Sequence, residues 1–380
     1  MKANRLLELK KAGQSLWIDY LSRDLISSGE LKRLVEEDGL SGVTSNPTIF
    51  QKAIEGSGLY DKQVQTLVSR GIKDPKELFL ALAFEDVSEA AGILMPVHKA
   101  TGGMDGYVSI EVSPNLAYDT DATVEEALRI FRSVGRNNIL VKVPATEPGL
   151  QAIEQLTGEG VNVNVTLLFS VSRYAAVADA YMKGIEKRVR LGLPVSDITS
   201  VASFFVSRVD TLVDKLLDVK LPKAGSVAGQ ERIKAVRGMA AVANARLAYG
   251  RFREIVAGPR FQVLKERGAR VQRLLWGSTS TKDPSYSDVK YVDELIGPDT
   301  INTMPEETIT MFREHGAVKP TLERGLTEAR SVFKELESLG VDMDIVSEEL
   351  EREGVQKFSD SFFDLLDKIT SKRDQFLRAA

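Results

Sequence analysis

The chain of 380 residues contains no cysteine, so disulfide bonds and thiolate chemistry are excluded. Its two histidines, His98 and His315, lie far apart, and a zinc site would therefore need carboxylate ligands throughout, which is unusual. The common nucleotide-binding motifs, a G-x-G-x-x-G after a strand and a G-x-x-x-x-G-K-[ST], are both missing. We therefore expect an activity that uses no metal and no cofactor.

Long apolar runs and a strong charge bias are missing too. No segment approaches the roughly 18 apolar residues of a membrane span, and the N-terminal MKANRLLELKKAG lacks the apolar core of a signal peptide. The 50 Lys and Arg residues against 54 Asp and Glu residues give a net charge of -4, which favours neither nucleic acid nor a membrane as partner. We expect a soluble, cytoplasmic protein, because the lack of cysteine suits a reducing compartment.

Eight short β-rich runs alternate with amphipathic helical stretches along the chain. The runs cover residues 16–20, 42–46, 107–112, 139–144, 161–169, 198–205, 273–278 and 300–305. Strands that alternate with helices indicate right-handed βαβ units and a parallel sheet, and eight units favour an α/β fold, the (β/α)8 or TIM barrel. An open, doubly wound sheet is the structural alternative.

The barrel is expected to carry extra helices. We predict a single domain over residues 1–380, with helical insertions at about 50–105 and 210–270 and a helical C-terminal extension at about 306–380. Asp121 or Thr123 is placed to cap the helix that follows the third run, and Ser170 the helix that follows the fifth. The apolar stripes of the C-terminal extension, which we expect to pack against the barrel, include Phe358, Phe362, Leu365 and Leu366.

Polar residues lie within or at the ends of the apolar runs. They are Asp19, Asn46, Glu111, Lys142, Asn164, Thr166, Ser203 and Ser278. The functional site of such a barrel lies at the C-terminal ends of its strands, so these side chains are expected to converge there. Lys142 in ILVKVPAT is the most informative, because lysine is rarely buried without a partner.

Each of these residues also has a structural explanation. Asp19 could cap the next helix, and Asn46 before Pro47 could simply start a turn. Lys142 could extend its ammonium group to the strand end, or form an ion pair with Glu111 or Asp19. For the whole set these explanations are weaker, because all its members would meet at one end of one barrel.

The set suits a particular chemistry. Burial in an apolar environment disfavours the charged form of an amine, so a buried lysine can act as a nucleophile near neutral pH. Its attack on a ketone gives a Schiff base, an electron sink that needs no metal. Glu111 and Asp19 could serve as acid and base, and the Asn, Ser and Thr groups suit the hydroxyls of a sugar. The residues alone therefore predict a Schiff-base enzyme that acts on a polyhydroxy carbonyl compound.

Five motifs, taken in order, resemble those of the transaldolase family. They are VTSNPTIF, VSIEVSPNLAYD, ILVKVPATEPGL, VNVNVTLLFS and SVASFFVSRVD, and they cover the chain from about Leu16 to about Arg208, with a weaker match beyond. The length and the stretch LWGSTSTKDP resemble the long bacterial branch of this class I aldolase superfamily. The resemblance implies transfer of a dihydroxyacetone unit from sedoheptulose 7-phosphate to glyceraldehyde 3-phosphate in the non-oxidative pentose phosphate pathway. The products are erythrose 4-phosphate and fructose 6-phosphate.

The resemblance also implies roles in catalysis. Lys142 on the fourth strand would form the Schiff base. Asp19 would take the proton from the C4 hydroxyl as the carbon–carbon bond breaks. Glu111 would act through a water held with Thr166 while the carbinolamine forms and dehydrates.

Further positions would bind substrate. Asn46 and Asn164 would hold hydroxyls of the three-carbon enamine, and Ser203 would contact the same fragment. Phe205 would form a wall of the pocket, and Arg208 would bind phosphate through its guanidinium fork.

The chain departs from the family pattern at the end of the seventh strand. Shorter transaldolases carry a phosphate-binding arginine there, whereas WGSTSTKDP has none. Lys282, with Ser278 or Thr281, is expected to take that role.

Alternatives to transfer remain open. They are a related sugar-phosphate aldolase that cleaves without transfer, and a non-catalytic barrel used for binding. Phosphorylated sugars are the expected partners, and the protein could be a homodimer or a monomer.

Overall fold

The computed structural model describes residues 4–55 and 57–378, and it contains a closed barrel of eight parallel strands in sequence order. The strands are β1 (Gln14–Ile18), β2 (Gly42–Val43), β3 (Tyr107–Glu111), β4 (Ile139–Pro144), β5 (Val163–Leu168), β6 (Ser200–Phe205), β7 (Arg273–Gly277) and β8 (Thr300–Met304). β1 closes the ring because it pairs with both β2 and β8. The predicted (β/α)8 barrel is therefore confirmed, and the open sheet is excluded.

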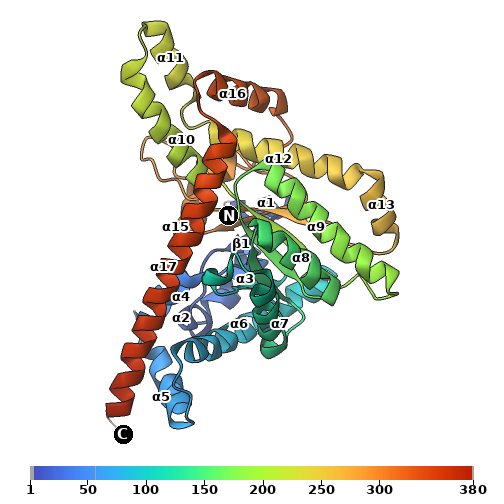
Figure 1. The fold of residues 1–380 in the computed structure, drawn as a ribbon, viewed down its shortest axis with the longest axis vertical. Coiled ribbons are helices and arrows are strands. Elements are labelled where there is room, and N and C mark those ends of the chain that lie inside the picture. The colour runs from blue at the N-terminus through green and yellow to red at the C-terminus, as the bar shows by residue number, and fades with distance from the viewer. Residues whose placement is uncertain (1–3, 56, 379–380) are drawn as a thin grey trace.

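Helices follow every strand and surround the barrel (Figure 1). The helices as far as β6 are α1 (Arg5–Lys11), α2 (Arg23–Ser27), α3 (Glu30–Asp38), α4 (Pro47–Glu55), α5 (Asp61–Ser69), α6 (Pro75–Ala100), α7 (Thr120–Val134), α8 (Glu147–Glu159) and α9 (Val171–Arg190). Those after β6 are α10 (Ser207–Lys220), α11 (Val227–Val236), α12 (Ala240–Ala257), α13 (Pro259–Glu266), α14 (Lys290–Asp293), α15 (Glu306–His315), α16 (Leu326–Ser338) and α17 (Met343–Arg378). The division into one domain with insertions stays a prediction.

The starts of two barrel helices show how local chemistry sets their bounds. The Ser170 hydroxyl accepts the N–H of Arg173 at the start of α9, as predicted. The prediction of Asp121 or Thr123 as the cap of α7 is wrong, because Asp119 accepts the N–H of Ala122. Asp119 has extended backbone, with φ at -126°, so the helix begins directly after it, and the two predicted residues lie inside its first turn.

The N-terminal half of the barrel interior is apolar. Side chains alternate between the two faces of a strand, and one inward position from each of six strands forms a single buried cluster. Its members are Trp17, Tyr107, Leu140, Val201, Leu275 and Ile301. The remaining core lies outside the barrel, between the strands and the helices.

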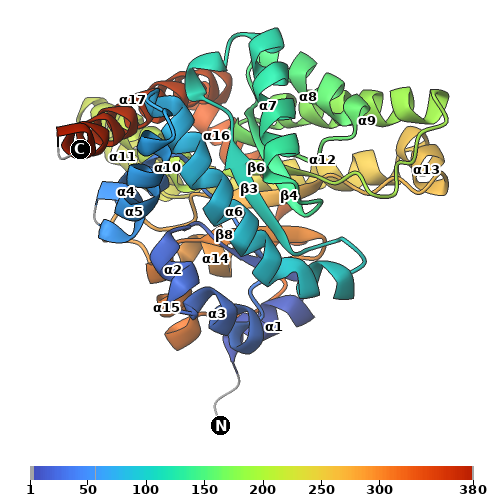
Figure 2. The same cartoon turned by 90° about the horizontal axis from the view of Figure 1, so that it is seen from below.

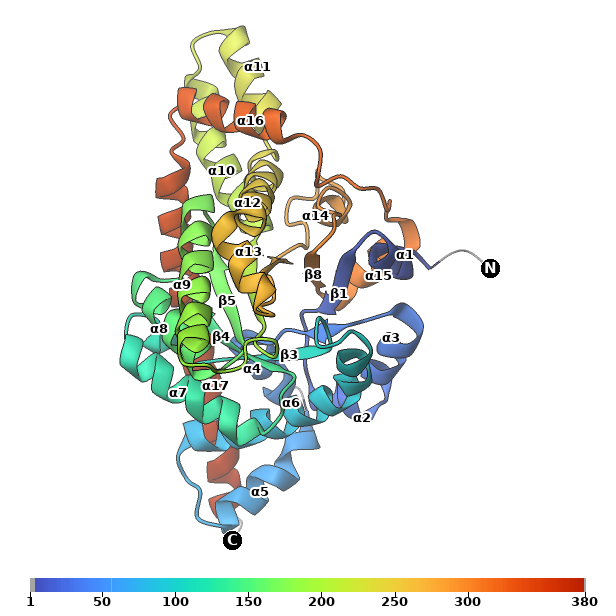
Figure 3. The ribbon, with the colours of Figure 1, turned by 90° about the vertical axis from the view of Figure 1, so that its right-hand side faces the viewer.

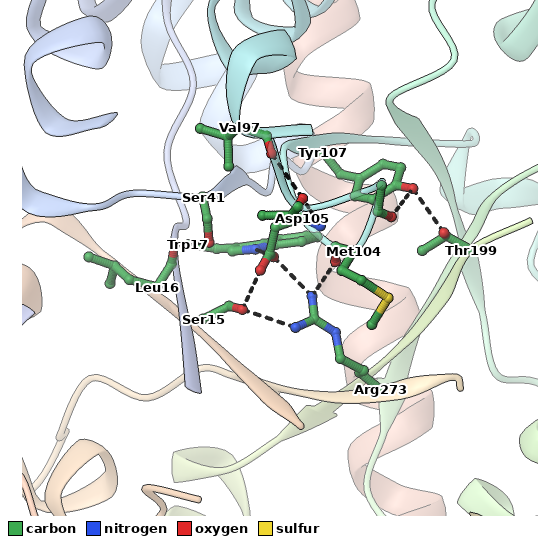
Figure 4. Close-up of polar contacts among 12 residues, drawn as sticks. Ser15, Leu16, Trp17, Ser41, Val97, Met104, Asp105, Tyr107, Thr199 and Arg273 are labelled. Carbon is green, nitrogen blue, oxygen red and sulfur yellow. Dashed lines mark hydrogen bonds and ion pairs between the residues drawn. The ribbon is translucent and has the colours of Figure 1, made fainter. Parts of the chain in front are cut away.

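A polar network lies beside this cluster and closes the bottom of the barrel (Figure 4). The carboxylate of Asp105 accepts hydrogen bonds from Ser15 at 2.6 Å, from Trp17 at 3.0 Å and from the guanidinium of Arg273 at 2.9 Å. Because Arg273 also donates to the carbonyl oxygen of Met104, it ties β7 to the loop that precedes β3. These bonds hold the Trp17 indole in place.

The C-terminal helix α17 is 36 residues long, about 54 Å at 1.5 Å per residue. It runs from α16 at one end to α5 at the other (Figures 1 and 3), and α1 lies on the opposite side of the molecule (Figures 2 and 3). Of its predicted apolar stripe, Phe358, Phe362 and Leu365 are buried and Leu366 is half-buried. No helix in the described part of the chain is long and apolar enough to span a membrane.

The close contact between β2 and Trp17 gives a test of the barrel interior. A Cβ atom at Gly42 would lie 2.3 Å from Cδ2 and Cε2 of the indole, which the bonds of Asp105 keep from moving. We therefore expect Gly42→Ala to lower the free energy of unfolding by about 1–3 kcal/mol, measured by urea denaturation. Gly225→Ala is the control, because nothing lies within 4 Å of its added Cβ. Equal stability of the two variants would contradict the tight packing.

Candidate active site

The C-terminal half of the barrel interior is polar, in contrast to the half below it. On six strands, the next inward-facing residue lies two positions beyond the apolar layer, and β2 and β5 each contribute one residue at the same level. These eight residues form a ring: Asp19, Thr44, Ser109, Lys142, Asn164, Ser203, Gly277 and Thr303. Seven of these eight residues have polar side chains. The period of two along each strand therefore places one polar ring at the end of the barrel where function is expected.

Lys142 of this ring lies beside Glu111, the next inward-facing residue of β3 after Ser109. The pairing of β3 with β4 sets the two residues opposite each other, and Lys142 Nζ lies 3.5 Å from Glu111 Oε2. Lys142 Nζ also donates to the carbonyl oxygen of Ser45 at 3.2 Å. Both side chains are buried, with exposed fractions of 4% and 3%. The predicted ion pair therefore exists.

The electrostatics of Glu111 follow from its burial. Because burial removes the carboxylate from solvent, the pKa of Glu111 is raised to about 7, although the positive charge of Lys142 acts in the opposite direction. Among the described residues, neither carboxylate oxygen of Glu111 nor the hydroxyl of Thr166 has a hydrogen-bond partner. Buried polar groups are rarely left in this state, which is typical of a site that receives a ligand or a water.

Asn164 is held at both ends of its amide group. Its Nδ2 donates to the hydroxyl of Ser109 at 2.9 Å, and its Oδ1 accepts from the hydroxyl of Ser203 at 2.6 Å. The three residues come from β5, β3 and β6, so the amide bridges across the barrel. Ser109 thereby fixes the orientation of the Asn164 side chain. Asn164 on β5 is paired in register with Lys142 on β4, so its amide group is held beside the lysine.

A second chain of hydroxyl groups leads to Asp19. The hydroxyl of Thr44 lies 2.6 Å from Asp19 Oδ1 and 2.7 Å from the hydroxyl of Thr303. Asp19 is half-buried, and its own backbone N–H donates to Met304. Its side chain is therefore oriented by Thr44. The alternative interpretation of Asp19 as the cap of α2 is wrong, because Ser22 caps this helix.

A cavity of about 160 Å³ opens onto this ring at the barrel mouth. Of the predicted site residues, those that line it are Asp19, Asn46, Lys142, Ser203, Phe205, Arg208, Ser278 and Lys282. Glu111, Asn164 and Thr166 lie behind them in the buried wall. The structure thus brings all eleven predicted residues to one end of the barrel.

Arg208 is the main cation of the cavity besides Lys142. It lies in the first turn of α10, and its guanidinium carbon is 5.2 Å from the ring centre of Phe205 and 5.8 Å from that of Phe358. Burial lowers the pKa of Arg208, and the nearby Asp19 and Glu353 act against this. Its Nη1 is buried without a hydrogen-bond partner among the described residues, as expected for a group that awaits an anion.

Three predicted residues have structural partners as well. Asn46 Oδ1 accepts the N–H of Ile49 at 3.0 Å, so the turn expected at this Asn-Pro pair exists, and only the amide nitrogen is left to meet a ligand. The Ser278 hydroxyl lies 3.0 Å from that of Ser207. Lys282 is exposed and donates to Ser280 at 2.7 Å.

Thr281, the alternative to Ser278 beside Lys282, is used by its own loop. Its hydroxyl donates to the carbonyl oxygen of Ser287 at 2.7 Å, and it does not line the cavity. Lys282 also faces a second, larger cavity of about 550 Å³ whose lining includes Asp210, Asp214 and Asp283. Its lining also contains Lys215 and Arg237, but Arg237 is paired with Asp218 and Asp283. The carboxylates there disfavour an anion, so the smaller cavity is the better site for a phosphate.

Four residues of the site were not predicted. The sequence could have indicated Thr44, Ser109 and Thr303, because each lies an even number of residues from another inward-facing position on its strand and therefore points into the barrel. It could not have indicated Phe358, because the place of this residue over the barrel is set by the tertiary packing of α17. Within the described residues, no three His, Asp or Glu side chains are grouped as metal ligands.

The comparison with protein families agrees with this geometry. The model of the transaldolase/fructose-6-phosphate aldolase family matches residues 16–369. The chain belongs to this family. The match extends well past Arg208, where the five motifs end, and includes most of α17.

Curated relatives match over nearly the whole chain. A protein named transaldolase 2 from Nostoc punctiforme is 48% identical over 375 residues, which are 98% of each sequence. A transaldolase from Frankia alni is 48% identical over 97% of this chain and 98% of its own. A transaldolase from Trichodesmium erythraeum is 44% identical over 98% of each. The relatives therefore share the long C-terminal region.

The raised pKa of Glu111 predicts a pH-dependent stability. Between about pH 4.5 and pH 7 the unfolded chain has lost this proton while the native state keeps it, so the free energy of unfolding falls as the pH rises. The loss is on the order of 3 kcal/mol and is complete above pH 7. Denaturant titrations from pH 5 to pH 8 should show a smaller fall for Glu111→Gln than for the wild type. Parallel curves would contradict the raised pKa.

Proposed function

We propose that this protein is a transaldolase that transfers a dihydroxyacetone unit from sedoheptulose 7-phosphate to glyceraldehyde 3-phosphate. The products are erythrose 4-phosphate and fructose 6-phosphate, as in the non-oxidative pentose phosphate pathway. The observation that carries the proposal is Lys142, an amine buried inside the barrel 3.5 Å from a carboxyl group and open to a cavity at the mouth. Membership of the family and the names of the relatives support it.

In this proposal Lys142 is the nucleophile. Its ammonium proton passes to Glu111, the neutral Nζ attacks the C2 carbonyl of the ketose, and the carbinolamine that forms loses water to become a Schiff base. The contact with the carbonyl oxygen of Ser45 aims the amine into the cavity. Ser45 is itself held by the bond from its hydroxyl to the backbone oxygen of Ser109 at 2.8 Å, so the nucleophile is positioned before substrate arrives.

Glu111 supplies and removes protons around the carbinolamine. A carboxyl group with a pKa of about 7 holds its proton for part of the time at neutral pH, which suits a general acid for the departure of hydroxide. A water between Glu111 and Thr166 would satisfy the unpartnered oxygens of both side chains and carry the proton.

Asp19 acts on the carbon–carbon bond. When its carboxylate takes the proton of the C4 hydroxyl, the C3–C4 bond breaks and the aldehyde leaves. The electron pair of the broken bond moves into the iminium and gives an enamine on Lys142. Thr44 and Thr303 orient the carboxylate for this step. In the reverse sense, the enamine carbon attacks the acceptor aldehyde and the new alkoxide recovers the proton from Asp19.

The remaining residues bind substrate. Ser203, Asn164 and the amide nitrogen of Asn46 would hold hydroxyls of the three-carbon unit, and Phe205 packs beside it. The unpartnered guanidinium of Arg208 would bind the phosphate group, with the exposed Lys282 as a second contact. Phosphorylated sugars as substrates follow from these two cations, and we propose that the enzyme works in the cytoplasm.

Trapping of the Schiff base tests the nucleophile. After incubation with fructose 6-phosphate and reduction with borohydride, mass spectrometry of the digested protein should find a three-carbon adduct on Lys142. Lys142→Met should give no adduct and no transfer while it keeps the fold, because Met fills a similar volume. Lys282→Met is the matched control, since this lysine lines the same cavity, and it should keep the adduct. An adduct on another lysine would overturn the assignment.

Replacement of Arg208 tests the phosphate site. Arg208→Lys keeps the charge but loses the guanidinium fork, and a charge-assisted hydrogen bond contributes about 1.5–3 kcal/mol. We therefore expect kcat/KM for glyceraldehyde 3-phosphate to fall roughly ten- to hundred-fold. With unphosphorylated glyceraldehyde as acceptor, the fall should be much smaller. An equal loss with both acceptors would place the phosphate elsewhere.

Steady-state assays separate transfer from simple cleavage. A transaldolase needs an acceptor aldehyde for turnover, whereas an aldolase of the same family releases free dihydroxyacetone from fructose 6-phosphate alone. Release without acceptor at a rate similar to that of transfer would favour the aldolase activity.

A further inference from the structure

One face of α17 lies against the C-terminal ends of the barrel strands. The Ser347 hydroxyl, which is 2.7 Å from the carbonyl oxygen of Met343 within the helix, also lies 3.1 Å from the backbone oxygen of Phe169, just beyond β5. Ser361 lies 2.8 Å from Thr48 at the start of α4, and Phe362 packs edge-on against Phe79 with ring centres 5.9 Å apart. Ser347 and Ser361 are fourteen residues, or about four helical turns, apart, and Phe362 is next to Ser361, so these positions lie along one stripe of the helix.

Gly354 shows how closely the stripe approaches the site. A Cβ atom at this position would lie 2.7 Å from Leu167 Cδ2 and 3.6 Å from Arg208 Nη1. Leu167 has a positive φ of 60°, which is strained for leucine and turns the end of β5 towards the helix. The glycine thus lets α17 pass directly over the buried arginine.

Phe358, one turn beyond Gly354, lies over both cations of the cavity. Its ring centre is 5.7 Å from Lys142 Nζ and 5.8 Å from the guanidinium carbon of Arg208. The residue is 5% exposed and forms part of the cavity lining. Among the described side chains of α17, no other lines this cavity. The helix therefore contributes a single apolar side chain to a pocket whose other walls come from the barrel.

The cavity is small with this ring in place. Its volume of about 160 Å³ is below the roughly 300–1,000 Å³ of most small-molecule sites. A group attached to Lys142 Nζ would lie under the ring, between it and the polar layer of the barrel. Water that enters from the mouth would have to pass the same ring.

This arrangement matters for the fate of the three-carbon enamine, and the argument rests on the function proposed above. Transfer forms a bond between the enamine carbon and the carbonyl carbon of the acceptor. Release begins when that carbon takes a proton instead, and water then adds to the iminium, so free dihydroxyacetone departs and the lysine amine is regenerated. Hydrolysis of the iminium is common to both outcomes, whereas protonation of the carbon occurs only in release.

We propose that Phe358 is a specificity-determining residue that shields the enamine carbon on Lys142 from water at the barrel mouth and thereby favours transfer over release. The water that hydrolyses the iminium would be held on the other side, between the unpartnered oxygens of Glu111 and Thr166, neither of which lines the cavity that Phe358 covers. Phe358 excludes bulk water without interfering with the proton transfers of Glu111.

The partition of the donor tests this role. Wild type and Phe358→Ala are supplied with fructose 6-phosphate and erythrose 4-phosphate, and sedoheptulose 7-phosphate and free dihydroxyacetone are both quantified. We expect the ratio of release to transfer to rise roughly ten-fold in Phe358→Ala, equivalent to about 1.4 kcal/mol in partitioning. Phe358→Leu, which keeps apolar bulk, should restore most of the wild-type ratio. It also serves as the test variant if the alanine protein does not fold.

The control is Phe363→Ala on the same helix, because that ring is 53% exposed and does not line the cavity. Its ratio should equal that of the wild type. If Phe358→Ala and Phe358→Leu lower transfer and release equally, the role is structural and the proposal is overturned. If borohydride traps no adduct in the wild type, the proposed function itself fails, whereas an adduct with an unchanged ratio in the variants contradicts only the role of Phe358.

Discussion

A lysine ammonium buried inside a β-barrel is the constraint on which the rest of the site depends. Burial of a charge is costly unless partners surround it, and Lys142 has Glu111, the carbonyl oxygen of Ser45 and the ring of Phe358. Each partner comes from a different element, so β3, the end of β2 and α17 must all be in register with β4. The same contacts that make the lysine tolerable also fix its position, and they leave room for a ligand on one side only.

The division of the barrel into two halves explains why one fold can be both stable and reactive. Below Lys142 the interior is filled by Trp17, Tyr107 and their apolar neighbours, and the Asp105–Arg273 pair closes the bottom. Above it the inward positions are polar and bonded to one another. Since the apolar packing lies in this lower layer and in the core between strands and helices, the upper layer can keep groups such as Glu111 in a state that costs free energy.

The period of two along the strands made most of this predictable from the sequence. The eight strands could be located from their apolar runs, and the polar residues within or at the ends of these runs could be placed at one end of the barrel. Ser109 follows from the alternation of side chains along a strand. Phe205, Arg208 and Lys282 were expected only from the resemblance to the transaldolase family. What the sequence did not predict depends on tertiary packing. The cap of α7 is Asp119 and not Asp121, because the chain enters that helix two residues earlier. Phe358 looked like an ordinary core residue of a C-terminal stripe, since nothing near it in the sequence shows that α17 crosses the barrel mouth.

A lysine that carries a reactive enamine must meet two opposite demands. Formation and hydrolysis of the Schiff base need water beside the nitrogen, while transfer needs the neighbouring carbon to be kept from it. In this barrel the groups that suit a bound water, Glu111 and Thr166, lie in the wall behind Lys142, and the apolar ring of Phe358 lies at the mouth in front of it. The two demands can thus be met at once because they apply to opposite sides of one side chain. A barrel alone offers only the wall, so the apolar cover has to come from an element outside it, and α17 is long enough to reach across and be anchored at both ends.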